Sequence, residues 1–150
     1  MNQEKLIFLQ NKKLTSFEEF AESALEKLIN DQTQEVKQVA LELLCESNRD
    51  ITYGVIKLGD EVQDGVPCLR TSNVKKRKII ANGVKRIDPK LSNEYERTIL
   101  KGSEVLVNVR GTLGGVALVP AQMANWNISR EVAMVAIDSL KANPEYISLF

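Results

Sequence analysis

The spacing of apolar residues changes once along the chain, near residue 50, and this change limits the folds open to it. Before residue 50, apolar residues recur with the period of an amphipathic helix. After it, short clusters of β-branched residues alternate with Gly, Asn, Asp and Pro, which is typical of strands joined by turns. We therefore expect an α+β fold, in which N-terminal helices precede a strand-rich, partly barrel-like domain.

The N-terminal helical segment is expected to span residues 1–48. Ser16 and Glu19 have the spacing of a capping box, which indicates the start of a first helix. A second helix is expected from about residue 33 to residue 47. Both helices would present an apolar stripe, which packs either on the chain's own domain, the simpler alternative, or on a partner.

The strand-rich domain is expected to span residues 49–150, with one short helix at 92–98. Asn143 followed by Pro144 is typical of a helix start, because asparagine caps free backbone N–H groups and proline suits the first helical position. Since six residues follow Pro144, we expect this domain to be cut at its C-terminal end. The expected strands are residues 52–58, 67–71, 78–80, 84–87, 104–110, 116–119 and 131–137.

Composition excludes several classes of protein. The longest apolar runs are too short to span a bilayer, and residues 1–13 do not resemble a secretion leader. Cys45 and Cys68 are expected to be free thiols in a reducing cytoplasm. Because histidine is absent, His-based triads, dyads and zinc sites are excluded. We find no catalytic or metal-binding constellation, so we expect a protein that is not an enzyme and holds neither metal nor cofactor.

The net charge of zero hides an uneven distribution. Residues 1–50 carry 6 Lys/Arg against 10 Asp/Glu, whereas residues 69–101 carry 10 Lys/Arg against 3 Asp/Glu. A basic segment between less basic neighbours indicates a surface that meets a polyanion, with a solvated lysine-rich loop as an equal alternative on charge alone.

Side chains in and around the basic segment suit nucleic acid. The run of Lys75, Lys76, Arg77 and Lys78 can neutralise phosphates. The stretch 70–73, Arg-Thr-Ser-Asn, brings hydrogen-bonding groups to the end of an expected strand, where arginine can read guanine and asparagine adenine. The glycine-rich stretch 111–115 lacks the spacing of a phosphate-binding loop, and is more typical of a hairpin turn.

A set of short motifs in a fixed order resembles the target-recognition domain of type I restriction–modification specificity subunits. The resemblance covers about residues 51–137, and it rests on the order of the set rather than on any one motif. The motifs are Tyr53-Gly54-Val55, Asp64-Gly65-Val66-Pro67, Leu69-Arg70, Arg86-Ile87, Tyr95-Glu96-Arg97, Leu100-Lys101-Gly102-Ser103-Glu104-Val105-Leu106-Val107, Arg110-Gly111-Thr112-Leu113-Gly114 and Asn127-Ile128-Ser129-Arg130.

This resemblance implies a mixed α/β domain that reads one half of a split DNA target and catalyses nothing itself. The implied partners are double-stranded DNA, a methyltransferase subunit that uses S-adenosylmethionine to methylate adenine, and an ATP-dependent restriction subunit; no membrane is implied. Two alternatives stay open, namely the recognition domain of a combined methyltransferase–nuclease and a non-catalytic protein-interaction module. The expected DNA-binding residues are Tyr53, Arg70, Thr71, Ser72, Asn73, Lys75, Lys76, Arg77, Lys78, Arg97, Arg110, Thr112, Asn127, Ser129 and Arg130.

Overall fold

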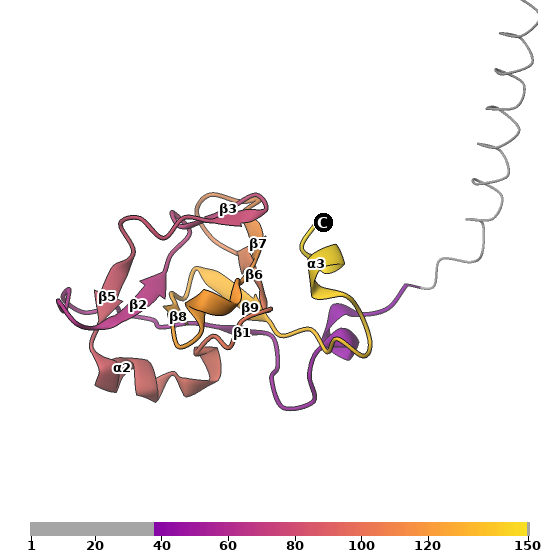
Figure 1. Cartoon of the computed structure of the whole chain (residues 1–150), viewed down its shortest axis with the longest axis horizontal. Helices are drawn as coiled ribbons and strands as arrows, with labels where there is room; N and C mark the ends of the chain where they lie inside the picture. Colours follow the sequence, from indigo (N-terminus) through magenta and orange to yellow (C-terminus); the bar gives the residue numbers. More distant parts are fainter. Residues whose placement is uncertain (1–37, 150) are drawn as a thin grey trace, which may run out of the picture. The chain divides into compact units, whose positions relative to one another are not determined.

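Short strands dominate the computed structural model, which describes residues 38–149 (Figure 1). All of these residues except Gln38 belong to one compact unit, Val39–Phe150. Because turn-forming residues interrupt every apolar cluster, no strand in the described part of the chain exceeds four residues. The strands are β1 (Thr52–Tyr53), β2 (Val66–Leu69), β3 (Val74–Lys75), β4 (Lys78–Ile79), β5 (Lys85–Ile87), β6 (Val105–Asn108), β7 (Val116–Leu118), β8 (Asn127–Ile128) and β9 (Val132–Val135).

The strands form three sheets. The largest is antiparallel with the order β1-β9-β6-β7, so its two best-buried strands lie in the middle. A second sheet has the order β5-β2-β8, in which β8 runs parallel to β2, and β3 and β4 pair as a separate hairpin. The main hydrophobic core lies between these sheets, and its largest fully buried members are Leu69, Leu100, Leu106, Ile128 and Met134.

Two short α-helices begin at proline residues that follow a capping side chain. In α2 (Pro89–Glu94), the Asp88 carboxylate accepts a hydrogen bond of 2.7 Å from the Lys90 N–H. A 3₁₀ turn, η2 (Glu96–Thr98), continues from it, so the helix expected at 92–98 starts earlier and changes its type. The helix start expected at Asn143 is confirmed, because its side chain caps α3 (Pro144–Ile147).

The expected fold class is wrong for the described residues. They consist mostly of strands with two short α-helices, and their three sheets do not close into a barrel. Closure fails because β1 and β7 remain separate edges of the largest sheet. Within residues 38–149, no helix is long and apolar enough to cross a membrane.

Most of the N-terminal helical segment, residues 1–37, lies outside the described residues. The described end of its second expected helix is not α-helical but forms a 3₁₀ turn, η1 (Leu41–Leu44). The reason is a competing backbone pairing, because the Glu46 N–H donates to the Ala136 carbonyl at 2.9 Å and the Asp138 N–H donates to the Leu44 carbonyl at 2.9 Å. These bonds pull the chain into an extended path beside the end of β9.

Candidate nucleic-acid interface

An open pocket of about 500 Å³ gathers arginine and tyrosine side chains from separate segments of the chain. Tyr53 comes from β1, Arg97 from η2, Arg110 from the loop after β6, and Arg130 from the connection between β8 and β9. None of the described residues that line the pocket is acidic. We call it the arginine–tyrosine pocket; its lining is Thr52, Tyr53, Gly54, Ile56, Tyr95, Arg97, Val109, Arg110 and Arg130.

Gly54 allows the segment that carries Tyr53 to pass directly against β8. A Cβ atom at position 54 would lie 1.8 Å from the Ile128 carbonyl oxygen, so no other residue fits this approach. The close contact lets the Val55 N–H donate to the Ile128 carbonyl at 2.8 Å, and the Arg130 N–H donate to the Val55 carbonyl at 2.9 Å. This pairing brings Tyr53 and Arg130 to the same pocket.

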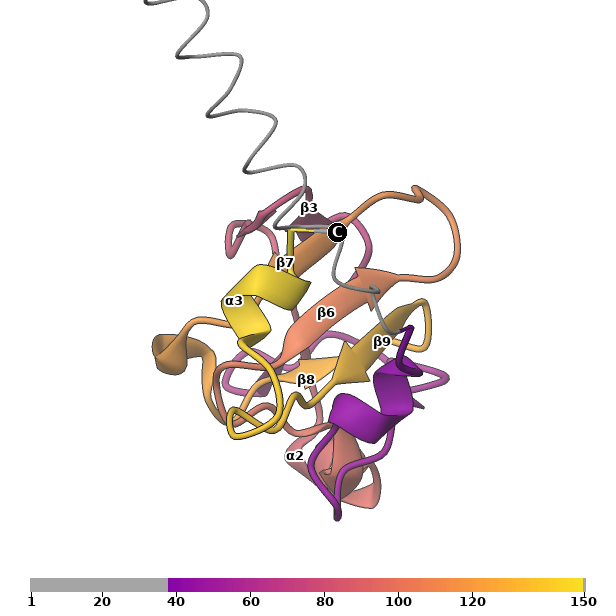
Figure 2. The same cartoon turned by 90° about the vertical axis from the view of Figure 1, so that its right-hand side faces the viewer.

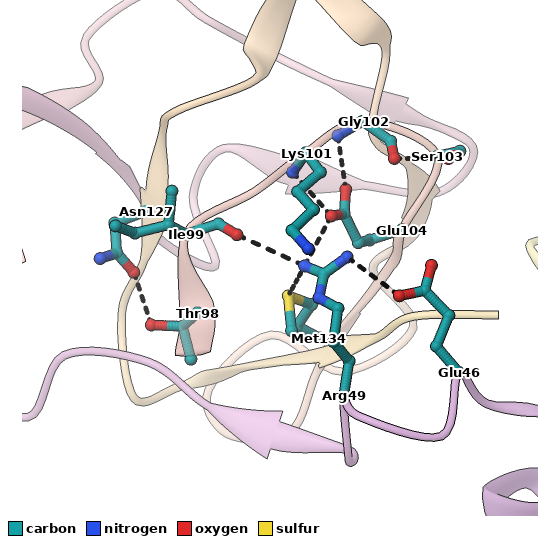
Figure 3. Close-up of polar contacts among 10 residues, drawn as sticks. All are labelled: Glu46, Arg49, Thr98, Ile99, Lys101, Gly102, Ser103, Glu104, Asn127 and Met134. Atoms are coloured by element: carbon teal, nitrogen blue, oxygen red, sulfur yellow. Dashed lines mark hydrogen bonds and ion pairs between the residues drawn. The ribbon is translucent and has the colours of Figure 1, made fainter. Parts of the chain in front are cut away.

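Asn127 supports the wall of the pocket that carries Arg97 from inside the domain. Its side-chain oxygen accepts a hydrogen bond of 2.7 Å from the Thr98 hydroxyl (Figure 3), and its amide nitrogen donates to the Ser92 hydroxyl at 3.0 Å. Asn127 has no exposed surface. These bonds tie β8 to the end of η2, which holds Arg97 at the surface.

The burial of Asn127 favours a structural role over the base contact expected from the sequence. Asn73 and Ser129 are also buried, with 3% and 1% of their surfaces exposed. We therefore place these three side chains beneath the candidate interface rather than on it.

Replacing Asn127 by alanine should lower the free energy of unfolding by about 1–3 kcal/mol, because it removes the buried bond to the Thr98 hydroxyl and leaves the buried Ser92 hydroxyl without its donor. Chemical denaturation measures this loss directly. Asn93→Ala, at an exposed neighbouring position, is the control and should be close to neutral. A variant that keeps full stability but loses selectivity between DNA sequences would instead assign Asn127 to readout.

A buried ion pair supports the same wall from the other side. Arg49 donates a hydrogen bond of 2.7 Å to the Glu104 carboxylate and one of 3.3 Å to the Ile99 carbonyl (Figure 3). Glu104 also accepts from the Lys101 and Gly102 N–H groups, at 2.7 and 2.9 Å. Sequence reasoning misses this pair, because its members lie 55 residues apart and no local pattern links them.

The basic run forms a second feature, which we call the basic hairpin: β3, β4 and the two residues between them, Lys76 and Arg77. Lys75 and Lys78 are direct cross-strand partners, and like charges in this position repel each other. None of the four basic residues has an ion-pair partner in the part of the chain that the structure describes. The basic hairpin therefore presents uncompensated positive charge at the surface.

One buried asparagine, Asn108, joins the basic hairpin to the glycine-rich loop. The Asn108 amide donates to the Val74 carbonyl and to the Thr112 carbonyl, both at 3.1 Å. A Cβ atom at Gly115 would lie 2.2 Å from that amide nitrogen, so glycine is required there. Next to Val74, at the open end of the hairpin, the Asn73 amide donates to the Ile80 carbonyl at 3.0 Å.

Loop 109–115 thus connects the two basic features, since Arg110 lines the arginine–tyrosine pocket and Thr112 is held beside the basic hairpin. Figure 2 shows the connection between β6 and β7 on the side of the domain away from α3. Thr71 and Ser72 lie next to the hairpin in sequence. Arg70 is partly buried, and its guanidinium donates to the Gly83 carbonyl at 3.3 Å, outside the pocket lining.

Comparison with known proteins gives one informative similarity. No protein-family model matches the chain. The chain is 26% identical over 142 residues to the type I restriction enzyme EcoBI specificity subunit of Escherichia coli, an alignment that covers 95% of this chain. The resemblance read from the sequence is confirmed. The chain spans about a quarter of the length of this curated relative, since 25% of that protein is aligned.

Tyr95 belongs to one of the motifs that carry the resemblance, but it is not among the expected DNA-binding residues. Tyr95 lines the pocket and also packs against a small core cluster of Val55, Cys68 and Ile87. Its signal in the sequence is the Tyr-Glu-Arg run that ends at Arg97. An aromatic side chain beside arginines adds a stacking surface to the charge of the pocket.

Neither cysteine has the properties of a nucleophile or a metal ligand. Both Cys45 and Cys68 are free, as expected, and both are buried. Burial raises the pKa of Cys68 to about 12, so its thiol stays protonated at neutral pH. Residues 38–149 contain no group of three or more Cys, Asp or Glu side chains placed to hold a metal ion.

Proposed function

We propose that this chain is the DNA target-recognition part of a type I restriction–modification specificity subunit. It reads one half of a bipartite target in double-stranded DNA, in the cytoplasm, and performs no chemistry itself. Methyltransferase subunits then methylate adenine, and restriction subunits cleave unmodified DNA. The observation that carries the proposal is the similarity to the EcoBI specificity subunit along 95% of the chain.

The chemistry of the two basic features supports a division of labour on DNA. Lysine side chains of the basic hairpin suit phosphates, which position a protein on the duplex without reading its sequence. Arginines on fixed segments suit base edges, because a guanidinium can donate two hydrogen bonds to guanine. Arg97, Arg110 and Arg130 fit this second role. Buried residues hold the segments of Arg97 and Arg130, and the buried Asn108 side chain holds the loop that carries Arg110 through the Thr112 carbonyl.

A selection from a random pool of duplexes, followed by fluorescence anisotropy, tests the proposal. We expect the chain to enrich a short asymmetric sequence and to bind it more tightly than random duplex, with an affinity that falls as salt rises. Polyglutamate of matched length is the control for a protein-interaction module. Equal binding to polyglutamate, with no enriched sequence, would favour that module and overturn the proposal.

The partner subunits are tested by co-purification. An adenine methyltransferase subunit produced together with the protein should co-elute with it and methylate DNA only at the enriched sequence. If the chain instead acted within a combined methyltransferase–nuclease, a separate methyltransferase subunit would not co-elute.

Replacing Lys75, Lys76 and Lys78 together by alanine should weaken binding to selected and random duplexes alike. The slope of log K against log salt should flatten by up to about 0.9 for each phosphate that these lysines neutralise in the unmodified protein. The triple replacement by arginine keeps the charge and should keep the slope. An unchanged slope in the alanine variant would show that the basic hairpin faces away from DNA.

A further inference from the structure

The arginine–tyrosine pocket has more room and more apolar wall than contact with the edge of a stacked base pair needs. Its volume of about 500 Å³ lies within the range of small-molecule sites. We infer that this pocket binds one unstacked nucleotide, with the phosphate on the arginines and the base against a tyrosine. This inference rests on the proposed function in one respect: the proposed function makes DNA the source of the nucleotide.

The positive charge of the pocket favours an anionic ligand. Arg97 and Arg110 are exposed and take part in no ion pair within residues 38–149. Arg130 contacts Glu131 at 3.1 Å, but the two side chains are 49% and 36% exposed. An ion pair exposed to this degree contributes little, so Arg130 can exchange Glu131 for a phosphate at small cost.

The aromatic and apolar side chains of the lining favour an anion that carries a base. Tyr53 is 59% exposed on an edge strand, which leaves its ring available for stacking. Ile56 and Val109 add exposed apolar surface to the same pocket. A free phosphate ion would use none of these three side chains, whereas a nucleotide uses them together with the arginines.

The pocket is also preformed, which favours a small ligand. The bonds of Asn127 with Ser92 and Thr98 hold the chain on both sides of Arg97, and the Arg49 and Glu104 pair holds the residues that follow. Gly54 holds the Tyr53 segment against β8. Because these supports are buried, the lining need not order itself on binding, and the entropic cost of binding is reduced.

Calorimetric titration of the full chain tests the inference. The probes are the four deoxynucleoside 5′-monophosphates, their deoxynucleosides and inorganic phosphate. At least one monophosphate should bind with 1:1 stoichiometry, about tenfold more tightly than phosphate and than its own nucleoside. The inference is overturned if phosphate binds as tightly as every monophosphate, or if no monophosphate shows saturable binding.

Matched variants locate the site. Arg97→Ala and Arg110→Ala should each weaken monophosphate binding about tenfold. Tyr53→Ala should weaken it several-fold, and Tyr53→Phe, which keeps the ring, should not. A melting curve for each variant confirms that it folds. Full monophosphate binding by both arginine variants would place the nucleotide elsewhere and overturn the inference.

Duplex binding separates this inference from the proposed function. A duplex with one unpaired nucleotide should bind about tenfold more tightly than its fully paired form, because the cost of unstacking is already met. If monophosphates do not bind and the paired duplex is still selected by sequence, the nucleotide site is contradicted and the proposed function is supported. If monophosphates bind but no duplex does, the proposed function is contradicted and the nucleotide site is supported.

Discussion

Replacing Arg49 by methionine should lower the free energy of unfolding by about 3–5 kcal/mol, because it leaves a buried carboxylate without its partner charge. Glu104 is 1% exposed, so water cannot replace the guanidinium that now lies 2.7 Å from it. The two backbone N–H groups of Lys101 and Gly102 remain as donors, but they carry no full charge. Urea denaturation at neutral pH measures the change.

Two further variants test whether the charge, rather than the packing of Arg49, is responsible. The double variant Arg49→Met with Glu104→Gln should recover part of the loss, because no unpaired charge remains. Glu46→Gln should be nearly neutral, since Glu46 lies 3.8 Å from the Arg49 guanidinium and its side chain is 44% exposed. A loss below about 1 kcal/mol for Arg49→Met would contradict this account of the pair.

Local chemistry explains which elements could be predicted from the sequence. The helix start at Asn143 and Pro144 depends on a cap and a proline that are neighbours in the chain, so the pattern alone identifies it. The two strands that sequence reasoning missed, β3 and β8, are two residues long and contain polar residues. Their pairing partners, not their own composition, make them strands.

The candidate interface could be predicted residue by residue but not as a site. Tyr53, Arg97, Arg110 and Arg130 are all expected from the sequence, and their contact with DNA remains a prediction. That they line one pocket depends on the long-range pairing of β1 with β9 and of Val55 with Ser129, which no local pattern specifies. For Asn127 the sequence is misleading. Its polar side chain suggests a contact at the surface, whereas in the structure it is buried and bonded to Thr98 and Ser92.

Replacing Arg97, Arg110 and Arg130 together by alanine should weaken binding to a selected duplex about 100-fold or more at moderate salt. The three side chains lie at the surface, so the melting temperature should change little. The slope of log K against log salt should fall by up to about 0.9 for each arginine that contacts a phosphate. Random duplex should lose less than the selected one, because an arginine on a base edge contributes about 1–3 kcal/mol of discrimination.

The matched control is the triple replacement of the same arginines by lysine. Lysine keeps the charge but cannot donate two hydrogen bonds in a fixed fork, so the salt slope should persist while the preference for the selected duplex is reduced. This outcome separates the pocket from the basic hairpin, whose lysines affect all duplexes alike. If the alanine variant bound selected and random duplexes with equally weakened affinity, the arginines would only position the duplex, and readout would have to come from the exposed side chains of loop 109–115.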